Sequence, residues 1–263
     1  MLYSETRIGR GRFFEGDCFD VMRDLPDGSV DMVLCDPPYG TTQNKWDSVL
    51  PLDRLWAEYW RVCKPNAAIV LTAAQPFTSA LVMSQLRHFR YDWTWRKPKG
   101  TGHLNAKKQP MRDKEDVLVF YKQQCIYNPQ MTAGTPYKDK AGKDHAARTS
   151  MTGSYGNYTN FRNDNIGTRY PKQVIEFGVV ERGTIHPTEK PTPLFEYLIR
   201  TYTDQGMVVL DNTAGSGTTA IAAENAGRAW ICIERDPNYA EKARQRIRDH
   251  VGVSEFDDFD ALL

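Results

Sequence analysis

Short apolar runs alternate along the chain with segments in which apolar residues recur every three or four positions. The runs have the length of buried parallel strands, and the spaced segments have the period of helices packed against a sheet. Strands are predicted at 30–35, 67–73, 91–96, 117–121, 207–210 and 229–233, and helices at 52–63, 75–86, 193–202, 218–226 and 237–250. This alternation predicts an α/β fold with a mainly parallel sheet and a ligand site at the carboxyl ends of its strands.

The stretch 123–182 lacks this alternation and is instead rich in Gly, Asn, Thr, Tyr, Lys and Arg. A structureless loop of this length is uncommon in a compact domain. Seven aromatic residues also argue against the alternative of a disordered linker: Tyr127, Tyr137, Tyr155, Tyr158, Phe161, Tyr170 and Phe177. We interpret 123–182 as an inserted recognition region between two halves of one domain, 1–122 and 183–250, with an acidic tail at 251–263.

The composition is that of an ordinary soluble globular protein, with 40% hydrophobic and 25% charged residues among 263. No run of about 18 apolar residues is present, and no apolar leader opens the chain, so we expect a cytoplasmic protein without membrane spans. The five cysteines form no C-x-x-C pair, which argues against a disulfide framework or a zinc cluster. We therefore expect no metal, and the net charge of +1 by itself indicates no polyanionic partner.

The first candidate for chemistry is Asp36-Pro37-Pro38-Tyr39, directly after the strand predicted at 30–35. The two prolines remove two backbone N–H donors and restrict the backbone. A carboxylate, a fixed carbonyl and an aromatic ring then meet at the end of a strand. This set suits a planar ring that carries an amino group, because the carboxylate and a carbonyl can accept the two amino protons while the tyrosine stacks on the ring. The alternative is a proline-rich turn with no chemistry.

The second candidate is the turn from Asp211 to Gly217, between a predicted strand and a predicted helix. Its glycines allow a ligand to approach a helix N-terminus, and Glu234, at the end of the next strand, suits a ribose diol. The dinucleotide pattern G-x-G-x-x-G is incomplete, because Ala220 stands at the third glycine position. A P-loop is excluded, since no Gly-Lys-Ser/Thr follows. The alternative is a tight strand-to-helix turn.

Together, the two motifs resemble the beta class of S-adenosylmethionine-dependent DNA amino-methyltransferases, in which the catalytic motif precedes the recognition insert and the cofactor motif. Segments 15–18, 25–31 and 186–191 also look like this family, and the resemblance extends from about Arg12 to Ile247. It implies a Rossmann-like methyltransferase fold with a mainly parallel seven-stranded sheet, helices on both faces and a permuted motif order. It also implies a target-recognition role for 123–182.

The resemblance further implies roles for individual residues. Asp36, Pro37, Pro38 and Tyr39 would be catalytic, holding the amino group of a flipped base. The residues implied to bind S-adenosylmethionine are Asp17, Asp36, Thr188, Lys190, Asp211, Thr213, Gly215, Gly217, Thr218 and Glu234. Within this set Asp17 would accept from the adenine amino group, Glu234 would bind the ribose, and Thr188 and Lys190 would approach the carboxylate.

The chemistry of an exocyclic amine explains this set. Its lone pair is delocalised into the ring, so hydrogen bonds to fixed acceptors are needed to direct the lone pair at the methyl group. Catalysis is then mainly positioning and electrostatics, and the base must leave the duplex to be reached. No Pro-Cys motif like that of cytosine-C5 enzymes occurs, and we assign Cys35, on a buried strand, to the core.

The charge distribution indicates a nucleic-acid partner more clearly than the net charge does. Between residues 87 and 114 there are nine Lys and Arg residues but only two acidic residues. We expect five of them to contact DNA phosphates: Arg96, Lys97, Lys99, Lys107 and Lys108. The alternative is a solvated charged face. A further expectation, homodimerisation, depends on surplus aromatic surface from Trp56, Tyr59 and Trp60.

The resulting hypothesis is a double-stranded DNA adenine-N6 methyltransferase, because the family's adenine enzymes favour Asp at the position of Asp36 while cytosine-N4 enzymes favour Ser. Cytosine-N4 is the first alternative. A nicotinamide-dependent oxidoreductase would use the same glycine turn but does not account for residues 36–39. A non-catalytic DNA-binding module and a structured RNA substrate also remain open, as does a partner restriction endonuclease that shares the target site but not the chain.

Overall fold

The computed structural model describes residues 2–41, 47–138, 165–180 and 189–253. The chain forms two compact units. Unit 1 comprises Met1–Asn128 and Gln173–Leu263, and unit 2 comprises Pro129–Lys172. In the described part of the chain, no helix is long and apolar enough to cross a membrane.

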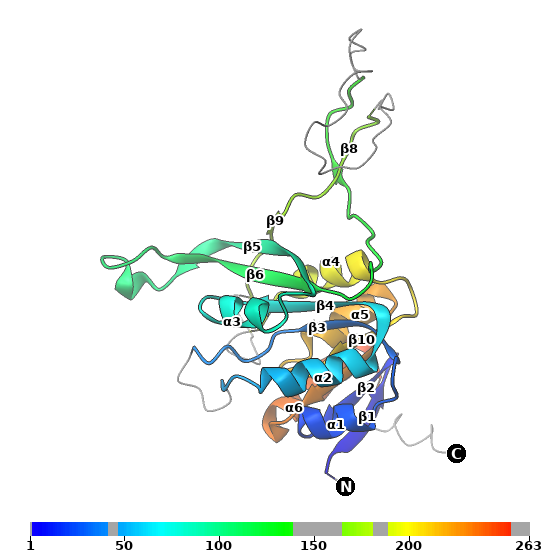
Figure 1. Cartoon of the computed structure of the whole chain (residues 1–263). Coiled ribbons are helices and arrows are strands. Elements are labelled where there is room, and N and C mark those ends of the chain that lie inside the picture. Colours follow the sequence, from blue (N-terminus) through cyan, green and yellow to red (C-terminus); the bar gives the residue numbers. More distant parts are fainter. Residues whose placement is uncertain (1, 42–46, 139–164, 181–188, 254–263) are drawn as a thin grey trace. The chain divides into compact units, whose positions relative to one another are not determined.

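Unit 1 is built on one large sheet (Figure 1), whose strands run in the order β1-β2-β11-β10-β3-β4-β6-β5-β9. Their bounds are β1 Ser4–Ile8, β2 Gly11–Glu15, β3 Val30–Cys35, β4 Cys63–Ala73, β5 Phe89–Thr101, β6 Arg112–Phe120, β9 Val174–Glu176, β10 Val208–Asp211 and β11 Ala229–Glu234. The strands from β2 to β4 and the pair β5–β9 are parallel, whereas β1–β2, β4–β6 and β6–β5 are antiparallel. The predicted mainly parallel α/β sheet is therefore confirmed.

The described residues place nine strands in this sheet rather than the seven expected. Three strands lie outside the six predicted ranges: the inner strand β2 and the two short edge strands, β1 and β9. Neither edge strand forms an apolar run, because β1 has an almost fully solvent-facing pattern and β9 has only three residues. An edge strand needs partners on one side only, so its sequence carries little hydrophobic signal.

Helices cover both faces of the sheet, as expected. Strand side chains alternate between the faces, so Met32 and Leu34 of β3 join one apolar core while Val33 and Cys35 join the other. The first core is covered by α4 (Thr192–Tyr202), α5 (Thr218–Ala226) and α6 (Pro237–Val251). The second is covered by α1 (Cys18–Asp24), α2 (Leu52–Val62) and α3 (Phe77–Ser84). Cys35 is fully buried, which agrees with its assignment to the core.

The aromatic residues of α2 bear on the expected homodimer. Trp56 and Tyr59 are 1% and 0% exposed, and Trp60 stacks on Trp56 with ring centroids 5.6 Å apart. These rings pack inside unit 1 because their spacing places them on the face of α2 that covers the sheet. Trp56 and Tyr59 therefore provide no surplus surface, Trp60 is only partly buried, and homodimerisation stays a prediction.

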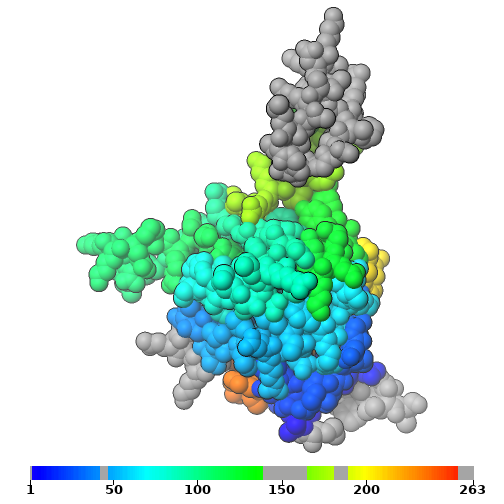
Figure 2. Space-filling view, in the orientation of Figure 1, coloured from blue at the N-terminus to red at the C-terminus, as the bar shows by residue number. Residues whose placement is uncertain are grey.

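The basic stretch forms a long antiparallel hairpin of β5 and β6, joined through the 3₁₀ turn His103–Asn105. Both strands extend beyond the apolar segments that predicted them, because the hairpin's outer part is polar. Figure 2 shows the green end of this hairpin projecting from the body of unit 1.

Unit 2 contains a short antiparallel pair, β7 (Thr132–Ala133) and β8 (Thr168–Arg169), and a bridge between Tyr137 and Asn165. It is narrower than the predicted 123–182 region, because the flanking residues belong to unit 1. The Asn128 N–H donates to the Thr201 carbonyl at 2.7 Å, and β9 pairs with β5. The target-recognition role stays a prediction, and most of the acidic tail lies outside the described residues.

Candidate active site

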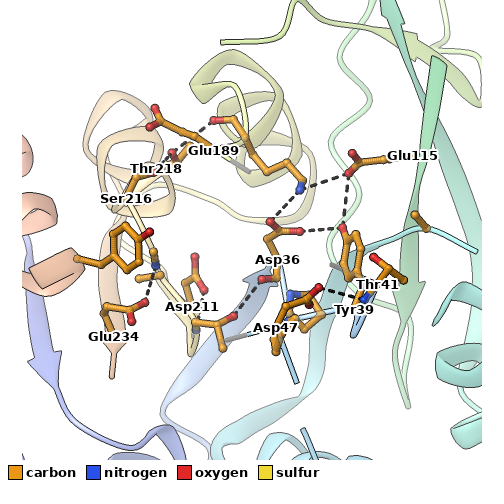
Figure 3. Close-up of a pocket in the computed structure, with 18 of the residues that line it drawn as sticks. Asp36, Tyr39, Thr41, Asp47, Glu115, Glu189, Asp211, Ser216, Thr218 and Glu234 are labelled. Carbon is orange, nitrogen blue, oxygen red and sulfur yellow. Dashed lines mark hydrogen bonds and ion pairs between the residues drawn. The ribbon is translucent and has the colours of Figure 1, made fainter. Parts of the chain in front are cut away.

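A cavity of about 1150 Å³ opens at the carboxyl ends of β3, β10 and β11 (Figure 3). It brings together the two predicted motifs, which are 175 positions apart at Asp36 and Asp211. Predicted site residues that line it are Asp17, Asp36, Pro37, Pro38, Tyr39, Lys97, Lys99, Lys190, Asp211, Thr213, Gly215, Thr218 and Glu234. Thr188, also predicted to bind the cofactor, lies outside the described residues.

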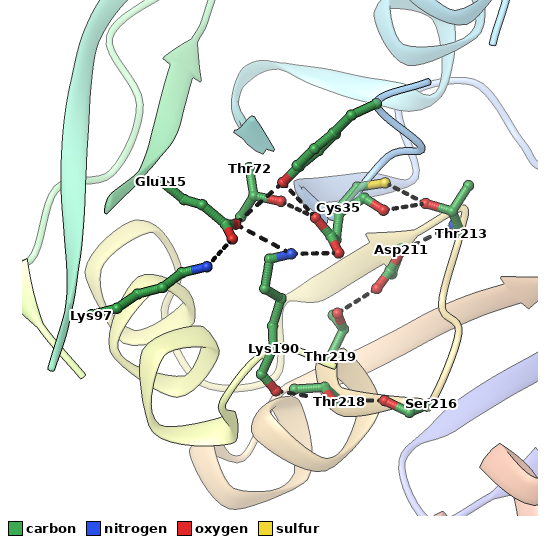
Figure 4. A network of polar contacts seen from close by, with 12 residues as sticks. Cys35, Thr72, Lys97, Glu115, Lys190, Asp211, Thr213, Ser216, Thr218 and Thr219 are labelled. Atoms are coloured by element: carbon green, nitrogen blue, oxygen red, sulfur yellow. Dashed lines mark hydrogen bonds and ion pairs between the residues drawn. The ribbon is translucent and has the colours of Figure 1, made fainter. Parts of the chain in front are cut away.

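Asp36, labelled in Figure 3, follows β3 and is held by three side chains, of which Thr72 and Lys190 are labelled in Figure 4. Its Oδ1 accepts hydrogen bonds from the Tyr39 hydroxyl at 2.7 Å and the Thr72 hydroxyl at 2.5 Å. Its Oδ2 accepts from the Lys190 ammonium at 2.7 Å. The carboxylate is therefore fixed in orientation at the cavity wall.

Tyr39 has a second set of contacts that its sequence position did not predict. Its ring stacks on Phe77 with centroids 5.4 Å apart, and Lys190 Nζ lies 5.5 Å from its ring centroid. Burial, reinforced by the negative charges of Asp36 and Glu115, raises its pKa well above the usual value. Tyr39 therefore remains a neutral phenol that donates to Asp36.

The turn after the motif is held by Asp47. Its carboxylate oxygens accept from the backbone N–H groups of Gly40 at 2.8 Å and Thr41 at 3.0 Å. Gly40 has a φ of +66°, a left-handed conformation that favours glycine. Asp47 thus stabilises the chain as it leaves Tyr39.

Asp211 ends β10 and is only 2% exposed. Its oxygens accept from the Thr213 N–H at 3.1 Å and the Thr219 hydroxyl at 2.5 Å. Burial raises its pKa from 3.8 to about 7, since two hydrogen bonds offset desolvation only in part. An acid that ionises near neutrality therefore lies beside the cavity.

Glu234 ends β11 and faces the same cavity. Its carboxylate accepts from the backbone N–H groups of Gly215 at 2.9 Å and Asp236 at 2.8 Å. Burial raises its pKa, and these backbone hydrogen bonds oppose the rise. The fixed carboxylate retains lone pairs that could accept from a diol.

The remaining predicted cofactor residues fall into different roles. The Thr213 hydroxyl donates to the Asp36 carbonyl at 3.1 Å, which joins the two motifs directly. Asp17 is the N-cap of α1 and accepts from the Phe19 N–H at 2.9 Å. Gly217 has a φ of +76° and does not line the cavity; a Cβ there would lie 3.0 Å from Ile247. Its conformation and packing explain the glycine better than ligand contact does.

Lys190 contacts two carboxylates of the protein, and its predicted approach to the cofactor carboxylate stays a prediction. It is 6% exposed and pairs with Asp36 and, at 3.3 Å, with Glu115. Burial alone would lower its pKa, but the charges of Asp36 and Glu115 outweigh burial and raise it. In this structure the ammonium therefore binds the catalytic motif.

The five residues predicted to contact DNA differ in their exposure and in their partners. Lys97 is largely buried, pairs with Glu115 and lies 4.9 Å from the Trp95 ring centroid, so it is not presented to a phosphate. Arg96 is exposed but pairs with Glu176 at 2.5 Å. Lys99 lines the cavity, and Lys107 and Lys108 are exposed at the end of the hairpin.

Sequence reasoning missed Glu115, Thr72 and Asp47. Thr72 lies within an apolar strand, and Asp47 follows the motif by eight positions without a recognisable spacing. Glu115 belongs to a charged run before an apolar strand, a pattern that equally describes a solvated strand end. The roles of Thr72 and Glu115 depend on strand pairing, and that of Asp47 depends on the conformation of a loop; a motif specifies neither.

A twisted, mainly parallel sheet with Asp-Pro-Pro-Tyr and a glycine turn at one cavity defines the class of nucleic-acid amino-methyltransferases. Residues 30–245 match the model of the N6/N4 methyltransferase family, described as DNA methylase. The chain belongs to this DNA methylase family, and the resemblance drawn from its motifs is confirmed.

Individual relatives agree with this assignment. The chain is 27% identical to the type II methyltransferase M.HpaI of Haemophilus parainfluenzae, over 95% of this chain and 77% of that protein. It is also 27% identical to the putative methylase YubD of Escherichia coli K12, over 90% and 89% of the two chains.

Solved structures confirm the Rossmann-like methyltransferase fold. The M1.HpyAVI–SAM complex has a TM-score of 0.61 and 24% identity, covering 90% of this chain and 99% of that one. The cytosine-N4-specific PvuII DNA methyltransferase has a TM-score of 0.63 and 16% identity, covering 95% of each chain.

Proposed function

We propose that the protein transfers a methyl group from S-adenosylmethionine to the N6 amino group of a flipped-out adenine at a specific site in double-stranded DNA. The methyltransferase class and its S-adenosylmethionine donor are those of the family. The single observation that supports an exocyclic amine as the methyl acceptor is the fixed carboxylate of Asp36 at the cavity wall beside Tyr39.

The donor set of the cavity fits S-adenosylmethionine. Glu234 offers a fixed carboxylate for a ribose diol, and Asp211 offers a buried acid for a cationic group. Asp17, Thr213 and Gly215 line the same cavity. When bound, the cofactor supplies an electrophilic methyl group on a sulfonium.

The chain's own residues orient the target amine. Asp36 and the carbonyl of Pro37 accept hydrogen bonds from its two N–H groups. These hydrogen bonds direct the nitrogen lone pair into the cavity. Thr72 and Tyr39 keep the Asp36 carboxylate in one orientation, so little reorganisation is needed as charge develops. The ring of Tyr39, supported by Phe77, is placed to stack on the extruded base.

Cytosine-N4 is the second candidate, because a cytosine-N4-specific enzyme is among the structural neighbours. Adenine is preferred because the family's adenine enzymes favour Asp at the position of Asp36. The relatives named as type II methyltransferases support a further proposal, a separate restriction endonuclease that shares the DNA target site.

The test is to incubate the full chain with mixed-sequence duplex DNA and S-adenosylmethionine carrying a labelled methyl group. The DNA is then digested to nucleosides and separated by mass. Labelled N6-methyldeoxyadenosine supports the proposal, whereas labelled N4-methyldeoxycytidine would identify cytosine, and not adenine, as the target. No label in DNA, with label in a matched structured RNA, would overturn the DNA substrate.

A further inference from the structure

Four charged side chains form a continuous chain of ion pairs beside the cavity (Figure 4). Asp36 pairs with Lys190 at 2.7 Å, Lys190 pairs with Glu115 at 3.3 Å, and Glu115 pairs with Lys97. The four side chains are between 6% and 21% exposed. Their formal charges cancel, so removing any one leaves an unbalanced charge in a partly dry site.

The position of Lys190 conflicts with the proposed role of Asp36. Its ammonium occupies Asp36 Oδ2, while two hydroxyls already occupy Oδ1. A target amine would therefore bind at the remaining lone pair of Oδ2, directly beside the ammonium. The nitrogen also gains positive charge during methyl transfer, and a nearby ammonium repels that charge.

Glu115 provides a second place for this ammonium. Its Oε2 lies 3.3 Å from Lys190 Nζ, and its Oε1 is occupied by Lys97. The long, rotatable stem of a lysine allows a short movement from one carboxylate to the other. Glu115 also lies 3.5 Å from the Tyr39 hydroxyl through the same Oε2, so the two carboxylates are close enough for such a transfer.

We propose that Glu115 is a positioning residue that takes the Lys190 ammonium from Asp36 when the target amino group binds. Lys190 neutralises Asp36 while the site holds no base, and its transfer to Glu115 exposes the acceptor oxygen. No bond is made or broken in this step, because only the partner of the ammonium changes. The inference rests on the proposed methyltransferase function and applies to an adenine or a cytosine amino group alike.

The test uses four full-length variants: Glu115→Gln, Lys190→Met, the double variant that combines them, and Glu58→Gln as control. Glu58 forms an ordinary ion pair with Arg61 at 2.7 Å on α2, away from the cavity. Turnover is measured at saturating DNA and S-adenosylmethionine, and cofactor affinity is measured by calorimetry. Glu115→Gln leaves Asp36 as the only carboxylate partner of Lys190 within this four-residue cluster, so kcat should fall by about 10- to 100-fold with unchanged cofactor affinity.

The double variant distinguishes positioning from simple structural support. Removing the trapped ammonium should raise kcat above that of Glu115→Gln with little change in thermal stability, whereas a purely structural role in charge balance would make stability and kcat recover together. A double variant that is as slow as Glu115→Gln, or slower, overturns the inference. So does a Glu115→Gln enzyme within twofold of wild type.

A second variant keeps the test decisive if Glu115→Gln does not fold. Glu115→Asp keeps the charge but withdraws the carboxylate by one methylene, so an intermediate kcat is expected, and a kcat equal to that of wild type would count against the inference. Wild-type protein with no methylated nucleoside product would instead refute the proposed function. Active wild type without rescue refutes only the role of Glu115.

Discussion

Asp211 should destabilise the folded protein at neutral pH, and Asp211→Asn should relieve the cost. Its pKa is raised from 3.8 to about 7 by burial. Between these two values the unfolded chain holds fewer protons than the folded chain, so stability falls as pH rises. A shift of about three pKa units corresponds to about 4 kcal/mol, with the full cost present above pH 7.

Asparagine has nearly the same shape as a protonated aspartic acid and cannot ionise. Its Oδ1 can accept from the Thr213 N–H, and its Nδ2 can donate to the Thr219 hydroxyl, at a cost on the order of 1 kcal/mol for altered hydrogen bonding. Asp211→Asn should therefore match wild type within about 1 kcal/mol at pH 4 and exceed its stability by about 2–4 kcal/mol at pH 8.

Urea unfolding of both proteins from pH 4 to 8, without cofactor, measures this difference directly. The control is Asp27→Asn, because Asp27 is 78% exposed and its ion pair with Arg61 should contribute little. A stability difference between Asp211→Asn and wild type that does not change with pH would refute the titration of Asp211. The same variant should bind the cationic cofactor more weakly, because the site would lose an acid that ionises near neutrality.

Asp36→Ala should reduce methyl transfer by at least about 100-fold, while thermal unfolding shows a folded chain; near-normal turnover would contradict its role. Glu234→Ala should weaken cofactor binding by roughly 10- to 150-fold in calorimetry, and unchanged affinity would move the cofactor elsewhere. Replacing Lys107 and Lys108 by Gln should reduce the slope of log affinity for DNA against log salt by up to about 1.8, with preference for the target site retained. Lys97→Met is the matched control for that slope, which it should leave unchanged because Lys97 is already paired with Glu115.

Much of the fold could be predicted because its elements have strong local signals. The helix that begins at Thr218 follows a glycine turn, and α6 begins after Asp236, whose side chain accepts from the Asn238 N–H at 2.8 Å. The edge strands β1 and β9 escaped prediction, because half-exposed edge strands have no apolar run. The hairpin of β5 and β6 was underestimated for the same reason, since its outer half is held by backbone pairing between polar residues.

The residues of the site also differ in how well the sequence predicts them. Asp36 and Glu234 could be recognised because each directly follows or ends a buried strand within a motif. The partners of Lys190 and Lys97 could not be predicted from a basic composition. Lys97 pairs with an acid on the neighbouring strand β6, and Lys190 pairs with acids that are far away in the sequence. Charge in a sequence indicates that a pair is available, but only the packing of strands decides which carboxylate is the partner.

The distance between the two motifs in sequence matters little because strand pairing sets their distance in space. Parallel pairing of β3 with β10 aligns Met32 with Val209 and Val33 with Leu210. Both strands therefore end at the same edge, where the Thr213 hydroxyl reaches the Asp36 carbonyl at 3.1 Å. The chain between the strands can change without moving this contact, provided that β3 and β10 keep their register.

A slip of one residue would turn the alternating side chains of β10 to the opposite faces and remove Asp211 from its hydrogen bonds. The buried cores on both sides of the sheet oppose such a slip, so the same packing that stabilises the fold also keeps the catalytic and cofactor motifs together.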